Sequence, residues 1–120
     1  MTTLTGEVFD DVPLGKLLAI GGPQLARAIA GLFLSIGPTR GAELAAAAAA
    51  SDWPTCGRLA HNLRSAAGNV GARRVQALAE QMEHAVTDGE TAKVAALAPL
   101  AVAEIASAVA TLQAWLDSRS

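Results

Sequence analysis

Apolar residues recur along most of the chain at intervals of three and four positions, the spacing of amphipathic helices. Glycine and proline separate these stretches, most clearly at Gly21–Pro23 and at Gly37 and Pro38. The pattern predicts helices over residues 10–20, 23–36, 39–50, 52–70, 72–87 and 90–116. Pro99 is expected to kink or divide the last of them, because its ring clashes with the preceding helical turn.

Short connections join the predicted helices, which favours antiparallel packing of helices that follow one another in the chain. We therefore expect an all-α fold, an up-and-down antiparallel four-helix bundle with one or two additional N-terminal helices. One domain is expected to span residues 1–120, with its core at about 10–116, because 120 residues is an ordinary domain size. Leu14, Leu17 and Leu18 are expected to cover one end of the bundle.

The composition narrows the classes of protein to consider. Hydrophobic residues make up 52% of the chain and aromatic residues only 3%, and 28 residues are alanine, which favours helix over sheet. Nine lysines and arginines against eleven acidic residues leave a net charge of −2, which argues against a nucleic-acid partner. The single cysteine, Cys56, excludes an internal disulfide and a zinc site with several cysteines. Its place on the core side of a helix predicts a buried thiol.

No secretion signal or membrane span is expected. The N-terminus lacks the basic start and the apolar stretch of a signal peptide. The most apolar stretch, residues 92–110, is interrupted by Lys93, Pro99 and Glu104, and it fits a bundle helix better than a transmembrane helix. The chain is therefore expected to be a soluble, cytoplasmic monomer with neither a membrane nor a nucleic-acid partner.

The fourth predicted helix carries the polar residues of greatest interest. Its core side consists of apolar residues within one arc of a helical wheel: Cys56, Leu59, Ala60, Leu63, Ala67 and Val70. His61 stands at the centre of the opposite side, with Arg58 and Arg64 on its flanks. Gly57 and Gly68 lie near it, each at a cost of about 1 kcal/mol relative to alanine. That cost indicates that something must come close to the helix backbone there.

An imidazole exposed between two arginines suits an acceptor for a negatively charged group, and phosphoryl is the obvious candidate. Neutral imidazole is well populated near pH 7, because the ordinary pKa of histidine is about 6.5. The commoner interpretation of such a residue is a solvated surface histidine, and the helical wheel alone favours that interpretation. His84, opposite the apolar stripe of residues 72–87, is expected to be only solvated, and no metal-binding constellation is visible.

The strongest family resemblance lies in residues 59–72, which read LAHNLRSAAGNVGA. They resemble the signature of histidine-containing phosphotransfer (HPt) domains, approximately A-H-x-L-K-G-S-[SA]-x-x-[LV]-G-A. Residues 78–83 resemble the family's L-A-x-x-L-E stretch, and residues 32–34 and 44–53 resemble its L-F-L and L-x-x-A-x-x-x-x-D-W segments. The resemblance covers roughly residues 10–116.

The resemblance implies an elongated bundle that relays phosphoryl groups between the receiver domains of hybrid histidine kinases and response regulators. His61 matches the residue whose Nε2 takes a phosphoryl group from one receiver aspartate and passes it to another. Arg64 matches a basic residue that neutralises phosphoryl charge, and Glu83 lies where some members place a side chain that hydrogen-bonds Nδ1 of the histidine. The chain would act as a phosphocarrier and not as an enzyme, without a cofactor or metal of its own and with Mg²⁺ on the receiver.

The surface that meets a receiver is expected around His61, at Gly57, Arg58, Ser65, Gly68, Arg73 and Arg74. Two positions depart from the family pattern, because arginine replaces lysine at 64 and serine replaces glycine at 65. Arginine keeps the charge but is a planar fork and not a compact point charge. Serine adds atoms beside the nucleophile. Either change could slow transfer or narrow the choice of partner.

Two alternatives stay open at this point. The chain could be an adaptor with the HPt fold that binds and regulates a receiver or a kinase without phosphotransfer. It could also be an enzyme with a small-molecule site. That function needs a second catalytic group beside His61, and the sequence offers no convincing pair of base and nucleophile on that side.

Overall fold

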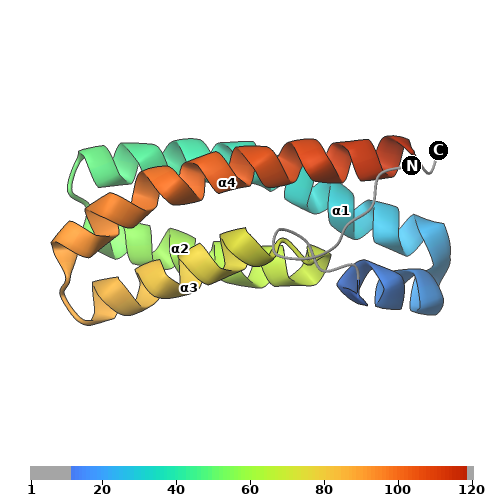
Figure 1. The fold of residues 1–120 in the computed structure, drawn as a ribbon, viewed down its shortest axis with the longest axis horizontal. Helices are drawn as coiled ribbons and strands as arrows, with labels where there is room; N and C mark the ends of the chain where they lie inside the picture. Colours follow the sequence, from blue (N-terminus) through green and yellow to red (C-terminus); the bar gives the residue numbers. More distant parts are fainter. Residues whose placement is uncertain (1–11, 119–120) are drawn as a thin grey trace.

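Four helices make up almost all of the chain that the structure, a computed structural model, describes, namely residues 12–118. They are α1 (Val12–Ala49), α2 (Trp53–Val70), α3 (Arg73–Thr87) and α4 (Thr91–Asp117). Connections of two or three residues make successive helices antiparallel, and the chain runs back and forth along its long axis (Figure 1). The prediction of an all-α, antiparallel four-helix bundle is confirmed. The expected helix start at residue 10 lies outside the described residues.

α1 changes direction at Gly22, which divides it into a short N-terminal part and a long part that belongs to the bundle (Figure 1). Gly22 has φ 71° and ψ −167°, a conformation that is open to glycine and strained for other residues. Pro23 then begins the long part, where a helix tolerates proline. The predicted break at Gly21–Pro23 is confirmed, and the short part is the additional N-terminal helix.

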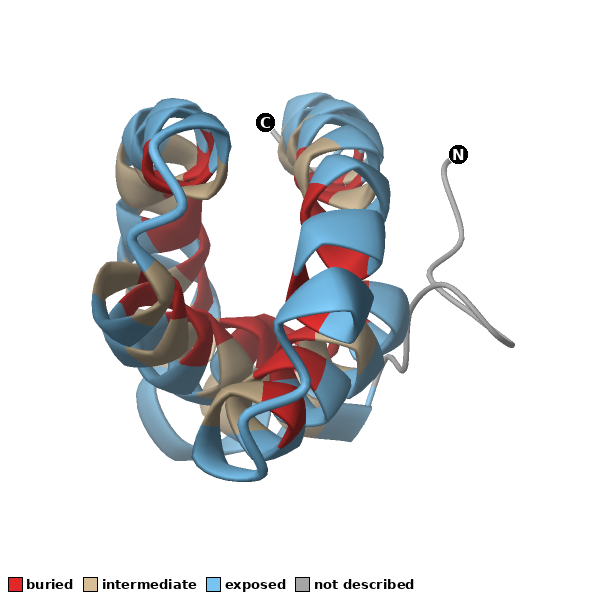
Figure 2. Cartoon of the chain, turned by 90° about the vertical axis from the view of Figure 1, so that its left-hand side faces the viewer, coloured by how far each residue is buried: buried red, intermediate tan, exposed pale blue. Residues whose placement is uncertain are grey.

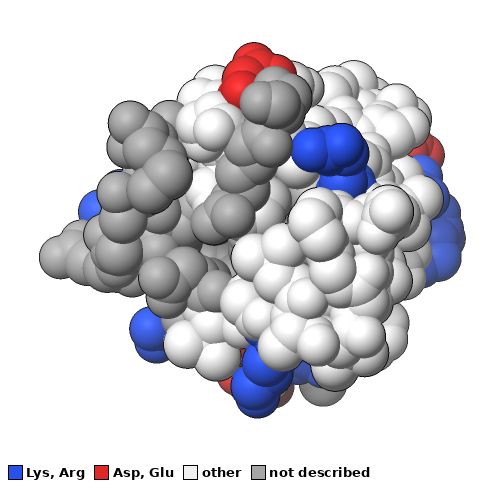
Figure 3. Space-filling model, turned by 90° about the vertical axis from the view of Figure 1, so that its right-hand side faces the viewer, with Lys and Arg blue, Asp and Glu red and all other residues white. Residues whose placement is uncertain are grey.

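This short part of α1 covers one end of the bundle. Leu14 is buried there, and Leu17 and Leu18 pack against the core, as expected. Figure 3 views this end, where uncharged residues make up most of the visible described surface, most charged side chains lie near the edge, and one basic side chain lies within the face. The N-terminal part therefore closes the core with apolar contacts.

The predicted break at Gly37 and Pro38 is wrong, because α1 continues through both residues to Ala49. Gly37 is buried where α1 meets α4, and a Cβ atom added to it would lie 3.0 Å from Cγ2 of Val109. Pro38 is exposed, and the packing of α1 against α4 holds the helix together across the hydrogen bond that the proline removes. The glycine therefore allows close helix packing, which a local pattern does not distinguish from a break.

Pro99 lies inside α4 without dividing it. By length and composition alone, α1 and α4 could both cross a membrane. Both helices also bury apolar residues in the bundle, and core helices of soluble proteins meet the same criterion. Length and composition are therefore weak evidence that either helix crosses a membrane.

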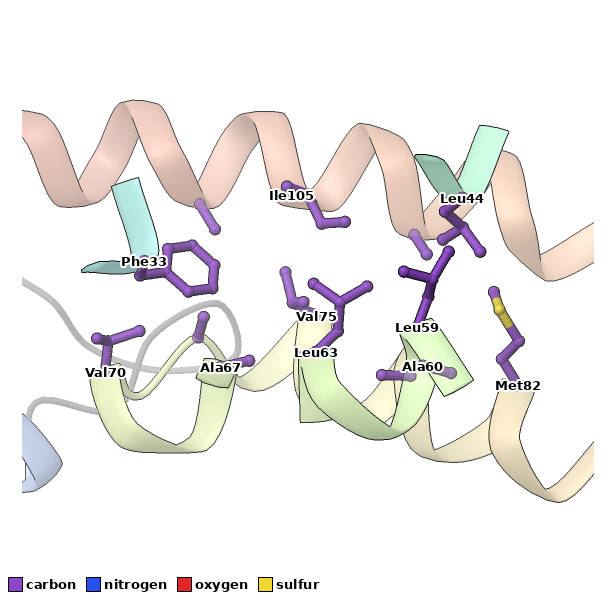
Figure 4. Packing of buried hydrophobic residues seen from close by; sticks show 14 of the residues in the cluster. Phe33, Leu44, Leu59, Ala60, Leu63, Ala67, Val70, Val75, Met82 and Ile105 are labelled. Atoms are coloured by element: carbon purple, nitrogen blue, oxygen red, sulfur yellow. The ribbon is translucent and has the colours of Figure 1, made fainter. Parts of the chain in front are cut away.

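The core runs along a bundle that measures 42 × 21 × 21 Å. Buried residues lie on the inner sides of the helices and exposed residues on the outer sides (Figure 2). All four helices contribute large side chains to it, including Phe33, Leu44, Leu63, Met82 and Ile105 (Figure 4). No polar or charged residue among residues 12–118 is buried, so apolar packing alone holds this core together.

Local interactions define both ends of α2, the helix that carries His61. The Asp52 carboxylate caps the N-terminus by accepting hydrogen bonds from the backbone N–H of Thr55 at 3.3 Å and from its hydroxyl at 2.7 Å. Pro54 lies in the first turn, where no helical hydrogen bond needs its missing N–H. Gly71 ends the helix in the left-handed conformation, at φ 79°.

Replacing Asp52 by alanine is expected to lower the melting temperature by a few degrees, because the cap of α2 is lost. The hydroxyl of Thr55, and then its backbone N–H, hold the pKa of Asp52 below its ordinary value. This stabilisation is therefore present in full above the unfolded pKa of about 3.9, and it is lost as the pH falls through the lower folded value. Thermal unfolding at a series of pH values measures both effects.

Asp52→Asn is the matched control, because asparagine keeps an acceptor oxygen and has no carboxyl group to titrate. The difference in melting temperature between wild type and Asp52→Asn should shrink as the pH falls below about 4. A difference that stays constant from neutral to acid pH would contradict the assignment.

Candidate functional site

The polar residues of interest lie along the side of α2 that faces α3. Gly57, His61, Arg64 and Gly68 recur at the spacing of one helical stripe. α2 and α3 form the most extensive of the helix–helix contacts, and they run antiparallel. The stripe therefore meets side chains of α3 that are distant from it in the sequence.

His61 is well exposed and is held through one ring nitrogen. Its side chain is 61% exposed, and its Nδ1 lies 2.7 Å from Oε2 of Glu83 on α3. An ionised carboxylate only accepts hydrogen bonds, so Nδ1 carries the proton in this contact. In the neutral ring, the lone pair is then on Nε2. In this arrangement Nε2 is the ring atom that could act as a nucleophile.

The same carboxylate also meets Arg64. Nη1 of Arg64 lies 3.1 Å from Oε1 of Glu83, and this oxygen is buried while the Glu83 side chain as a whole is 24% exposed. The contact pairs opposite charges without the alignment of a hydrogen bond. Glu83 thus joins the imidazole and a guanidinium one turn farther along α2. A negative group added at Nε2 would find Arg64 close by.

The two glycines of the stripe are explained by α3 itself. A Cβ atom added to Gly57 would lie 3.0 Å from Cγ1 of Val86, and one added to Gly68 would lie 2.9 Å from Nε2 of Gln76. Both glycines are half-buried under these side chains. What comes close to the backbone of α2 is therefore the neighbouring helix. His61 and Glu83 lie between these two close contacts.

A shallow polar groove begins beside His61 and continues toward the C-terminal end of α2. It is lined by Arg64, Ser65, Gly68, Asn69, Gln76 and Glu80. Ser65 is exposed there, at the position expected beside the nucleophile. Sequence reasoning missed Asn69, Gln76 and Glu80. Gln76 and Glu80 lie on the same stripe of α3 as Glu83. The sequence shows this stripe, but only the pairing of the helices shows that it faces α2.

The remaining arginines of the expected surface lie on α2 and at the start of α3. Arg58 is exposed on α2. Arg73 and Arg74 begin α3, and α2 runs for about 14 Å beyond His61, at 1.5 Å per residue, before it ends at Val70. Arg74 also pairs with Glu104 of α4 at 3.4 Å. The structure therefore joins Arg64 to His61 through Glu83 and places Arg73 and Arg74 toward the far end of α2.

Two other reactive side chains stay apart from this cluster. Cys56 is buried on the core side of α2, as predicted, and burial raises the pKa of its thiol. His84 is exposed on α3, also as predicted. In residues 12–118, no group of three or more His, Cys, Asp or Glu side chains could hold a metal ion. Among the described residues, the candidate reactive cluster therefore consists of His61, Glu83 and Arg64.

Comparison with known proteins points to one family. A family model described as Hpt domain matches residues 28–115. The structure of histidine-containing phosphotransfer protein B (HptB) from Pseudomonas aeruginosa is similar to this chain, with a TM-score of 0.86 and 20% identity over 95% of this chain and 98% of that one. The histidine-containing phosphotransfer domain of ArcB from Escherichia coli is also similar, with a TM-score of 0.73 and 25% identity over 94% of this chain and 96% of that one. No curated protein sequence matches.

Proposed function

Since the chain belongs to the Hpt domain family, which supports a role in histidine phosphotransfer within phosphorelays, we propose that His61 is the residue that carries the phosphoryl group. The observation that supports this assignment is the 2.7 Å contact between Nδ1 of His61 and Glu83, on a side chain that is 61% exposed. The contact favours an unprotonated Nε2 that a partner protein can reach.

The proposed step needs no proton transfer. The lone pair of Nε2 attacks the phosphorus of an aspartyl phosphate on a receiver domain, and the N–P bond forms as the bond from phosphorus to the aspartate oxygen breaks. The aspartate leaves as a carboxylate with that electron pair. His61 becomes an imidazolium that keeps its proton on Nδ1, beside the Glu83 carboxylate. Transfer to a second receiver reverses these events, so the same geometry serves both directions.

Arg64 has a part in this step by electrostatics. Its guanidinium lies one turn beyond His61 and is partly exposed, so it is available to a phosphoryl oxygen as well as to Glu83. Mg²⁺, which we expect the receiver to supply, would offset charge on the transferring group from the other side. The chain itself then acts as a phosphocarrier, with its chemistry completed by the partner.

The proposed partners are receiver domains of hybrid histidine kinases and of response regulators. They would dock over His61, against Ser65, Gly57, Arg58 and the polar groove of α2 and α3. Binding is expected to be transient, because a relay must release each partner. We further propose that the chain works as a monomer in the cytoplasm, where receiver domains are found.

Incubation of the purified chain with receiver domains that carry a radiolabelled phosphoryl group tests the proposal. Label should pass to the chain, be stable to base and labile to acid, and map to the peptide that contains His61. A second, unlabelled receiver should then remove it. Receivers that donate to their own partners but never label this chain would overturn the proposal. Binding without labelling would favour an adaptor.

A further inference from the structure

We propose that Gly57 is a positioning residue for His61, because its missing side chain lets Val86 seat against α2 and so brings Glu83 within hydrogen-bond distance of the imidazole. Gly57 lies one turn before His61 on α2, and Val86 lies one turn after Glu83 on α3. In an antiparallel pair these two contacts are neighbours. The consequence for transfer rate rests on the proposed function, whereas the geometric claim does not.

The contact between Gly57 and Val86 is tight. A Cβ atom at position 57 would lie 3.0 Å from Cγ1, 3.4 Å from Cβ and 3.6 Å from Cγ2 of Val86. The whole end of the valine side chain therefore lies over the glycine. An added methyl group at position 57 requires the neighbour to give by a few tenths of an ångström.

Val86 has little freedom to give way. Its side chain is branched at Cβ, and such residues strongly prefer one χ1 rotamer in a helix. It is half-buried and packs against the hydrophobic core, so a rotation would disturb other contacts. We therefore expect a methyl group at position 57 to be accommodated by a small separation of α2 from α3 at this turn.

A separation at this turn acts directly on the next contact along the pair of helices. The His61–Glu83 distance is 2.7 Å, and a hydrogen bond weakens as distance and alignment depart from their optimum. When this bond weakens, the neutral imidazole is freer to carry its proton on Nε2. The nucleophilic lone pair is then lost from the atom that faces the partner.

Gly68 is a natural comparison for Gly57 on the same stripe of α2. A Cβ atom there would lie 2.9 Å from Nε2 of Gln76, which is the far end of a flexible side chain. Gln76 can turn aside without moving the α3 backbone. Alanine at position 68 therefore adds the same methyl group to the same helix and leaves the helix separation unchanged.

The test compares wild type with Gly57→Ala, Gly68→Ala, Val86→Ala and the double variant Gly57→Ala/Val86→Ala. Nitrogen-15 NMR of the His61 ring reports which nitrogen carries the proton, and it requires no phosphotransfer partner. Gly57→Ala should increase the fraction with the proton on Nε2. Gly68→Ala and Val86→Ala should match wild type, and the double variant should return to it, because truncation at position 86 removes both Cγ atoms.

Transfer from a labelled receiver should be slower by about tenfold in Gly57→Ala and should recover in the double variant, because a displacement of about 1 Å can cost about 100-fold and this one is smaller. Gly68→Ala is compared by its ring signals alone, because Gly68 lines the proposed docking groove. The inference would be overturned if Gly57→Ala gave the ring signals of wild type. It would also be overturned if the double variant folded but kept the ring signals of Gly57→Ala. If the ring signals change as expected but neither wild type nor any variant takes up the phosphoryl group, the proposed function fails and the positioning role of Gly57 stands. If Gly57→Ala does not fold, Val86→Ile presses on the same contact from α3 and should give the same ring signals.

Discussion

Replacement of His61 by alanine is expected to reduce phosphoryl transfer to background, a loss of at least about 10³-fold in rate. Nε2 of His61 is the atom that bonds to phosphorus in the proposed step, and alanine offers no nucleophile. Glu83 would not take its place, since its carboxylate faces the position of Nδ1 and Arg64. The initial rate of label transfer from a phosphorylated receiver measures the effect.

His84→Ala is the matched control for this prediction. His84 is the other histidine of the chain, and it is exposed on α3. Its replacement should leave the transfer rate unchanged. Both variants should unfold close to the wild-type temperature, because substitutions of exposed side chains change stability little. Label that persists in His61→Ala, or that is lost in a folded His84→Ala, would refute His61 as the acceptor.

Replacement of Glu83 by alanine is expected to slow transfer by about 10- to 100-fold, because a hydrogen bond to a charged group contributes about 1.5–3 kcal/mol. The carboxylate lies 2.7 Å from Nδ1 of His61 and favours the proton there, and in the proposed step it would stay beside the imidazolium that forms as phosphorus bonds to Nε2. Without it, part of the population carries the proton on Nε2 and the developing positive charge has no partner. Single-turnover transfer at saturating receiver concentration isolates this effect from binding.

Two further variants separate this role from a general loss of acidic charge. Glu83→Gln keeps an acceptor oxygen without the charge, so its rate should fall between those of wild type and Glu83→Ala. Glu80→Ala removes an exposed carboxylate one turn earlier on α3. Because Glu80 lines the proposed docking groove, its single-turnover rate is compared at saturating receiver concentration, where it should be close to that of wild type. Equal rates for wild type and Glu83→Ala, or an equal loss in Glu80→Ala, would contradict the assignment of Glu83.

The helices that surround the site were predictable because local patterns there agree with one another. The prediction of 52–70 compares with Trp53–Val70 for α2, and 72–87 compares with Arg73–Thr87 for α3. Caps and turns mark the ends of these helices, and the apolar periodicity marks their buried sides. At Gly37 and Pro38 the local pattern predicts a break, but packing against α4 keeps the helix continuous.

The site was predictable only in part. The helical wheel placed His61 on the polar side of α2, and a family resemblance suggested a partner for its Nδ1 at Glu83. The meaning of Gly57 and Gly68 could not be read from the sequence, since the side chains that cover them come from α3. The same limit hid the groove residues Gln76 and Glu80.

By itself, the sequence determined the two helices of the site, the buried side of α2 and the exposure of His61, because these follow from spacing and capping within a single segment. Only the tertiary structure decided that Glu83 lies within hydrogen-bond distance of Nδ1 of His61, and which side chain lies over Gly57. Those contacts depend on the register and separation of α2 and α3. Both are set by close packing of a core whose residues are distant in the chain, and no local pattern contains that information.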